Sequence, residues 1–152
     1  MGLYLFSNNM RLFLFKMHTN ILGLNNRVAH FIHDHSPICT FCRIRLLNDA
    51  PDESTLHLFY ECPSVIIYVR VEFFKWWYNE NYDYIISRQE LFLVQCEDGK
   101  STSTSLTKTV LAKICLKYIW DCRNRYCLPN LGDAKETVTQ DIISISNGSK
   151  IN

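Results

Sequence analysis

The sequence contains no apolar run that approaches the roughly 20 residues needed to cross a bilayer. Its start, Met1-Gly2-Leu3, leads into a segment with neither the basic stretch nor the small-residue cleavage site of a secretory signal. Phe6 stands where a myristoylation signal would carry serine or threonine. These absences predict an intracellular protein, in the nucleus or the cytoplasm, without membrane attachment.

The sequence also lacks the short motifs by which several classes of enzyme bind phosphate, activate a serine or hold a catalytic metal. It has no Walker loop, no G-x-S-x-G turn and no H-E-x-x-H helix. We therefore predict that the chain is not an enzyme and has no small-molecule substrate.

An excess of charge of one sign is missing as well, since the net charge is only +1. The charge is unevenly spread: +3 over residues 1–50, −5 over residues 51–100 and +3 over residues 101–152. A basic surface in the first third is compatible with nucleic acid binding, but the charge of the whole chain does not demand it.

Cysteine is frequent, but the count is odd. Seven cysteines without a secretory signal fit a reducing compartment, with some thiols on a metal and the rest in the core. Cys122-x4-Cys127 imitates half a metal site, yet Cys122 continues an apolar helical stripe, so core packing is favoured there. Cys96 and Cys115 have no partner at ligand spacing and are also predicted in the core.

Four residues have the spacing of a metal site. Cys39-x2-Cys42 is followed, after fourteen residues, by His57-x4-Cys62. Zinc takes four tetrahedral ligands from thiolate and imidazole, and three cysteines with one histidine form a common closed set. A two-residue gap lets both thiolates of a tight turn point at one ion, and a four-residue gap places His57 and Cys62 about one helical turn apart on one face. We therefore predict a structural zinc site over residues 36–63 with these four ligands.

Other interpretations of these residues stay open. Free cysteine is among the most buried residue types, so the three cysteines could pack in a core beside an unrelated histidine. His33 or His35 could replace or supplement His57, although each is expected to cap a helix end or to lie in solvent.

Apolar periodicity predicts a helix from Met10 to about Leu22, which Gly23 ends. Asn25 or Asn26 can cap a short second helix over residues 27–33. Residues 43–53 are predicted to form a polar loop between the two ligand pairs.

Further helices are predicted over residues 65–78, after the capping-box pattern Ser87-x2-Glu90, and over residues 106–126. In the last of these, Lys113 lies off the apolar stripe, which consists of Leu106, Val110, Leu111, Ile114, Cys115, Tyr118, Ile119 and Cys122. The aromatic run around Trp76 and Trp77 is favoured as core over a base-stacking surface. The fold class is mainly α: a small helical domain over residues 8–127 with one zinc-stapled loop region. A polar, flexible tail follows over residues 128–152, in which Asp133 and Glu136 could start a weak helix.

Three segments together resemble the zinc-binding domain at the C-terminal end of non-LTR (LINE-type) retrotransposon reverse transcriptases. Residues 13–28 resemble its helical lead-in, in which Asn25 and Arg27 match and Leu24 replaces threonine. Cys39-x2-Cys42 and Glu53-Ser54-Thr55-Leu56-His57-Leu58-Phe59-Tyr60-Glu61-Cys62-Pro63 are similar to the family's Cys-x2-Cys and Glu-Thr-x-x-His-Leu-Phe-x-x-Cys-Pro signature. Residues 118–124 resemble its closing helix. The fourteen-residue gap before His57 is longer than the family pattern.

The resemblance implies a structural-zinc, nucleic-acid-binding module detached from its polymerase. The polymerase motif itself is absent, because Asn81-Tyr82-Asp83-Tyr84 offers one carboxylate where two-metal nucleotidyl transfer needs a pair. RNA or DNA would be the partner, together with the polymerase part of a reverse transcriptase. Arg27, Arg43 and Arg45 are the candidate phosphate contacts. The alternative is a zinc-stabilised protein-interaction or structural domain that touches no nucleic acid, or a remnant of an element without function.

Overall fold

The structure is a computed structural model, and it describes residues 6–45, 49–73, 76–77, 87–92 and 103–148. Its helices are α1 (Asn8–His18), α2 (Asn25–Val28), α3 (Thr40–Ile44), η2 (His57–Glu61), α4 (Pro63–Val65), η3 (Ile66–Phe73), α6 (Arg88–Phe92), α7 (Ser103–Asn124) and α8 (Leu131–Gly148). Within these ranges the extended pairing consists of one isolated antiparallel bridge between Ile38 and Asp52. The mainly helical fold class is therefore confirmed. No described helix is long and apolar enough to cross a membrane.

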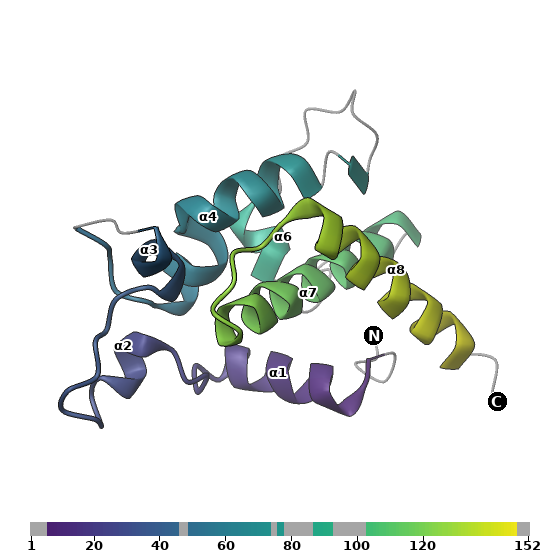
Figure 1. Cartoon of the computed structure of the whole chain (residues 1–152). Helices are drawn as coiled ribbons and strands as arrows, with labels where there is room; N and C mark the ends of the chain where they lie inside the picture. The colour runs from purple at the N-terminus through teal and green to yellow at the C-terminus, as the bar shows by residue number, and fades with distance from the viewer. Residues whose placement is uncertain (1–5, 46–48, 74–75, 78–86, 93–102, 149–152) are drawn as a thin grey trace.

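Helix α7 is the centre of the fold. Figure 1 shows it between α1 on one side and α8 on the other, and α6 also packs on it. Its buried residues are Leu111, Ala112, Lys113, Ile114, Cys115, Leu116, Tyr118, Ile119 and Cys122. The predicted stripe is thus confirmed as buried at Leu111, Ile114, Cys115, Tyr118, Ile119 and Cys122, and Val110 is partly buried. The placement of Lys113 off the buried surface is wrong. A helix surrounded by neighbours on several sides buries more than one stripe.

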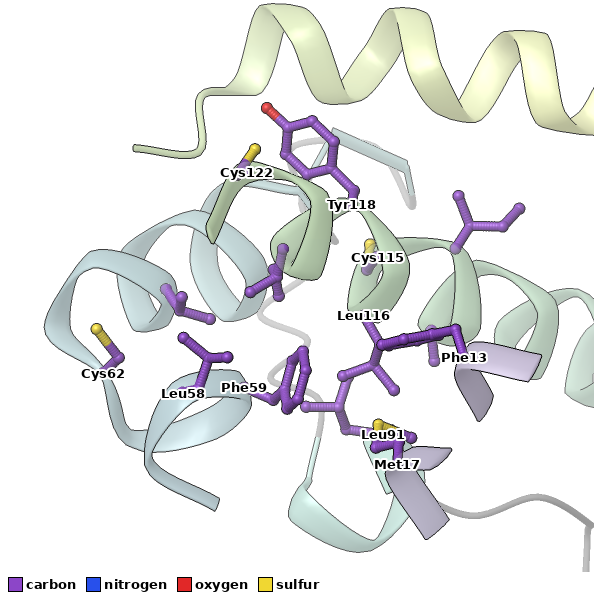
Figure 2. Close-up of a cluster of buried hydrophobic side chains, with 14 of the residues drawn as sticks. Phe13, Met17, Leu58, Phe59, Cys62, Leu91, Cys115, Leu116, Tyr118 and Cys122 are labelled. Carbon is purple, nitrogen blue, oxygen red and sulfur yellow. The ribbon is translucent and has the colours of Figure 1, made fainter. Parts of the chain in front are cut away.

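One hydrophobic core joins the helices around α7. Figure 2 shows Phe13 and Met17 of α1, Phe59 of η2 and Leu91 of α6 near Leu116 of α7, with Leu58 of η2 between Phe59 and Cys62. The Phe13 ring meets the Phe59 ring edge to face, with centroids 6.1 Å apart. Trp76 and Trp77 are partly buried against this core, as predicted.

Helix α1 starts earlier and ends earlier than predicted. The Ser7 hydroxyl accepts a hydrogen bond from the Met10 amide at its start. The helix ends at His18 instead of Leu22, and Asn20, not Gly23, takes the left-handed conformation, with φ 56°. Asparagine tolerates that region because its short polar side chain can bond locally, so the helix needs no glycine to end.

The second helix is shorter and earlier than predicted, because α2 spans Asn25–Val28 instead of residues 27–33. Neither predicted cap acts as one: Leu24 is the N-cap residue and no side chain caps the helix. The Asn25 side chain is instead buried and bonded to other parts of the chain. By contrast, the predicted capping box of α6 is confirmed, since the Ser87 amide donates to the Glu90 carboxylate (2.9 Å) and the Glu90 amide to the Ser87 hydroxyl (3.2 Å).

The C-terminal segment corrects the prediction of a flexible tail over residues 128–152. Residues 131–148 form α8, which packs against α7 and η3 and buries Ala134 and Val138. The Asn130 side chain accepts from the Asp133 amide (2.9 Å) at the start of this helix. Tyr118 projects from α7 toward α8 in Figure 2, and its hydroxyl bonds to the Asn130 carbonyl. A small number of apolar residues is enough to hold α8 against the core, because Ala134 and Val138 are four residues apart and lie on one face of the helix.

Candidate metal centre

The four predicted ligands come together at one end of the molecule, where α2, α3 and α4 gather in Figure 1. Cys39 is the N-cap of α3 and Cys42 lies within it, while His57 begins η2 and Cys62 caps its end. Their ligand atoms all lie within 4.8 Å of one another, so these residues could hold a metal ion. The prediction that these four side chains form one group is confirmed.

Three of the six distances between the ligand atoms match the edges of a tetrahedral zinc site. Zinc–sulfur bonds of about 2.3 Å and zinc–nitrogen bonds of about 2.0–2.1 Å imply sulfur–sulfur edges of about 3.8 Å and sulfur–nitrogen edges of about 3.6 Å. The Cys39 and Cys62 sulfurs are 3.9 Å apart, those of Cys42 and Cys62 3.8 Å, and Cys42 Sγ is 3.5 Å from His57 Nε2. A disulfide would need sulfurs about 2.05 Å apart, so the cysteines are free thiols around a common centre.

The chain holds the first ligand pair by short backbone links. The Cys39 amide donates to the Pro51 carbonyl (2.9 Å) and the Glu53 amide to the Pro37 carbonyl (2.8 Å), on either side of the Ile38–Asp52 bridge. This pairing anchors the strand-like entry to α3 and places Cys39 and Cys42 on its first turn. The polar loop predicted over residues 43–53 begins later than predicted, because α3 continues to Ile44. The Ile38–Asp52 pairing holds its C-terminal end, and residues 46–48 lie outside the described residues.

The second ligand pair depends on a wide helical turn that the sequence did not reveal. The Cys62 amide donates to the His57 carbonyl, five residues back, at 2.7 Å. In a regular α-helix, residues five apart point about 140° away from each other, so the expectation that they share one face of an α-helix is wrong. The five-residue hydrogen bond of a π-type turn widens the helix and returns both side chains to one side.

The centre is closed to solvent. Cys39 and Cys62 are 0% exposed, Cys42 is 1% and His57 is 6% exposed. The Ser54 hydroxyl accepts from the His57 amide (3.1 Å), which holds the start of η2 beside the loop. Four buried protein ligands leave no open coordination position, which is the property of a structural metal site and not of a hydrolytic one.

The thiols influence one another strongly. The hydrogen bond that the Cys39 thiol donates to Cys62, together with burial, raises the pKa of Cys39 to about 12. Burial, followed by the neighbouring Cys39, raises the pKa of Cys42 to about 11. Receiving that hydrogen bond lowers the pKa of Cys62, and the Ser64 amide, which donates to the same sulfur, lowers it further. A metal ion binds thiolate, so its binding would displace these protons.

Other candidate ligands lie outside the group. The His33 ring is fully exposed and pairs with Asp34 at 3.2 Å, and His35 Nε2 bonds to the Asn25 amide oxygen at 2.9 Å. Cys115 and Cys122 are buried in the core, as predicted, whereas Cys127 is exposed. Cys96 lies outside the described residues.

The three arginines proposed for phosphate contact are all exposed. Arg43 is in the last turn of α3 and Arg45 follows it, both directly beyond Cys42. Arg27 is partly engaged within the chain, because its guanidinium donates to the Asn20 carbonyl (2.9 Å) and lies over the Phe31 ring.

A buried ion pair lies next to the candidate metal centre, and neither residue spacing nor charge pattern in the sequence predicts it. Glu53 is 0% exposed and pairs with Arg123 of α7 at 2.6 Å. Burial would raise the pKa of Glu53, but the hydrogen bonds from Arg123 and from the Thr40 amide outweigh it and hold the pKa below its usual value. Both residues belong to motifs that carry the family resemblance, which is the only signal in the sequence that could have singled them out.

Comparisons with known proteins identify no relative of the chain. No family model matches the chain, and neither the search of curated proteins nor the search of solved structures found a match. The resemblance to the retrotransposon domain therefore still depends on the quoted motifs alone.

Proposed function

We propose that the chain binds one zinc ion as a structural cofactor through Cys39, Cys42, His57 and Cys62. The observation that carries this proposal is that the four ligand atoms lie within 4.8 Å of one another and that three of their six distances, 3.5 to 3.9 Å, match the edges of a zinc-sized tetrahedron. Three thiolates and an imidazole are soft and borderline ligands, which favour zinc over magnesium or calcium. The zinc would hold α3 against η2 and supply no chemistry to a substrate.

We further propose that this zinc-held region is a nucleic-acid-binding module, like the reverse transcriptase domain that the motifs resemble. The supporting observation is that Arg43 and Arg45 are exposed directly beyond Cys42 on a helix tied to the centre. Fixing their backbone lowers the entropy that is lost when the side chains meet phosphates. The polymerase part of a reverse transcriptase would be the natural neighbour of such a module.

Salt dependence of binding tests this function directly. Zinc-loaded protein is titrated onto labelled single-stranded RNA and onto duplex DNA of equal length, from about 50 to about 200 mM salt. Phosphate contact predicts an affinity that falls steeply and linearly on a log–log plot, with little dependence on sequence. An absence of binding to either polymer at the lowest salt would remove the nucleic acid function while leaving the zinc site intact.

A second candidate is a zinc-stabilised protein-interaction domain. It is favoured by a specific observation: Phe31 is 77% and Ile32 is 56% exposed in the turn after α2. Apolar contact with a protein partner depends much less on salt than phosphate contact does. The same titration therefore separates the two functions, because a protein-interaction domain should bind neither RNA nor DNA even at the lowest salt.

A further inference from the structure

The Glu53 carboxylate binds three segments of the chain at once. Its Oε2 accepts from the Thr40 amide (2.8 Å) in the first turn of α3. Its Oε1 accepts from the Asn25 amide (3.0 Å) at the start of α2, and from Arg123 through Nε (3.0 Å) and Nη2 (2.6 Å). Both oxygens of a fully buried carboxylate are thus occupied, and each segment lies in a different part of the sequence.

Asn25 completes the same group around Cys39. Its Nδ2 donates to the Ile38 carbonyl (2.7 Å) and to the Thr40 hydroxyl (3.1 Å), which are the residues on either side of Cys39. Its Oδ1 accepts from Arg123 Nη2 (3.0 Å). Arg123 also donates to the Gly23 carbonyl (3.2 Å), so one guanidinium of α7 contacts the backbone before α2 as well as the Asn25 and Glu53 side chains.

We infer that Arg123 and Glu53 are positioning residues of the metal centre. Arg123 holds the Glu53 carboxylate, and the carboxylate holds the Thr40 amide between the ligands Cys39 and Cys42. This inference rests on the proposed zinc function. It adds that the ligand geometry is set from α7, a helix that supplies no ligand.

The geometry favours this role over that of an ordinary stabilising ion pair. A buried pair is weak evidence for stability, because desolvation offsets much of the attraction. Here one carboxylate oxygen of Glu53 accepts a hydrogen bond from the Thr40 amide, one residue after Cys39. If Arg123 is removed, the Glu53 carboxylate is left charged and buried without its ionic partner. It must then shift or take up a proton, and either change weakens its hold on the Thr40 amide. Groups that orient metal ligands in this way typically affect metal affinity by roughly 10–100-fold.

The experiment measures the affinity for Zn²⁺ by competition with a chromophoric chelator, together with the visible spectrum of the Co²⁺-loaded protein. The full chain is compared with Arg123→Met, Arg123→Lys and Glu53→Gln. Glutamine can accept with only one atom and would direct its NH₂ group at a donor. Two controls lie on or beside α7: Arg125→Met at an exposed position, and Leu111→Ala, which lowers stability in the core without touching this group.

We expect Arg123→Met and Glu53→Gln to bind Zn²⁺ roughly 10–100-fold more weakly than the parent and to show altered Co²⁺ bands. Arg123→Lys should lose less, because it keeps the charge but not the forked donors. Unchanged affinity in both folded variants overturns the inference, and so does an equal loss in Leu111→Ala. If Arg123→Met and Glu53→Gln fail to fold, Arg123→Lys decides: a weaker affinity than Arg125→Met supports the inference, and an equal affinity overturns it.

Failure of the zinc function is a separate outcome. If the parent chain itself binds no Zn²⁺ in the chelator competition, the proposed cofactor is wrong, and this inference falls with it. If the parent binds and the Arg123 and Glu53 variants bind equally well, the cofactor stands and only the positioning role is lost.

Discussion

Cys62 and His57 are joined by a backbone hydrogen bond of 2.7 Å that spans five residues, and this bond brings two of the four candidate ligands to one side of the turn. A regular α-turn over the same residues would direct their side chains apart. Leu58 and Phe59, which follow His57 in this turn, are fully buried in the core, and their burial stabilises the wide turn. The metal centre is therefore built on the core and not appended to it.

The first prediction is one zinc ion per chain. Elemental analysis of purified protein should find one equivalent of zinc, and Cys42→Ser should lower the bound zinc clearly below one, because a closed site loses one of its four bonds. Cys127→Ser is the matched control, since that thiol is exposed and outside the group. Full zinc content in Cys42→Ser would contradict the assignment of the ligands.

The second prediction concerns what the metal stabilises. Removing zinc with a chelator should raise hydrogen exchange over residues 36–63, where four thiol and imidazole groups would be left without their ion. The buried middle of α7, residues 111–119, should keep most of its protection because its packing with α1, α6 and α8 does not involve the metal. Equal protection of residues 36–63 with and without zinc would show that the loop folds by itself.

The third prediction concerns Lys113, which is buried in α7 and donates to the Leu91 carbonyl at 3.4 Å. Burial lowers the pKa of Lys113 from 10.5 to about 8. Below pH 8 the folded protein keeps a charge that would be better hydrated in the unfolded chain, so Lys113→Met should raise the free energy of unfolding at pH 7 by about 1–3 kcal/mol. Lys117→Met, at a more exposed position one turn later, is the control.

The sign of the pH dependence follows from the same pKa. Between pH 8 and 10.5 the unfolded chain holds the proton that folded Lys113 has lost, so the contribution of Lys113 to the free energy of unfolding should rise with pH in this window. In the metal-free chain the thiols of Cys39 and Cys42, whose pKa values are raised, contribute in the opposite direction, so the comparison with Lys113→Met isolates the lysine. The advantage of Lys113→Met over the parent should accordingly shrink as pH rises. Denaturant titrations at several pH values measure this difference, and an advantage that is constant from pH 7 to 10 would mean that Lys113 is not held in an apolar site.

Local sequence patterns predicted the structure correctly where a feature belongs to a single helix or turn. The ligand spacing, the capping box at Ser87 and the apolar stripe of α7 each appear in the structure, because each depends on residues close in sequence. The end of α1 at His18, the wide turn at His57 and the buried pair of Glu53 with Arg123 were not predictable in that way. The helix end and the wide turn are changes of backbone conformation that residue spacing does not indicate. The buried pair joins segments 70 residues apart, which propensity and periodicity do not contain.

The fourth prediction tests the nucleic acid surface. Replacing Arg27, Arg43 and Arg45 by alanine should weaken binding to RNA or DNA at low salt and should flatten the salt dependence by up to about three phosphate contacts. The effect of Arg27 should be the smallest of the three, because its guanidinium already donates to the Asn20 carbonyl.

The control for this surface removes the same charge elsewhere. Arg11, Lys16 and Arg125 are exposed on α1 and beyond α7, and none of them follows the Cys39–Cys42 turn. If their triple alanine variant reduces binding and the salt slope as much as the first triple variant does, only the net charge matters and the assigned surface is wrong. If the first variant alone lowers the slope, while its zinc content stays at one per chain, the phosphates bind beside α3. That result would also explain why a structural metal is placed at this end of the molecule, since the zinc then holds the arginine-bearing helix in a fixed orientation toward the nucleic acid.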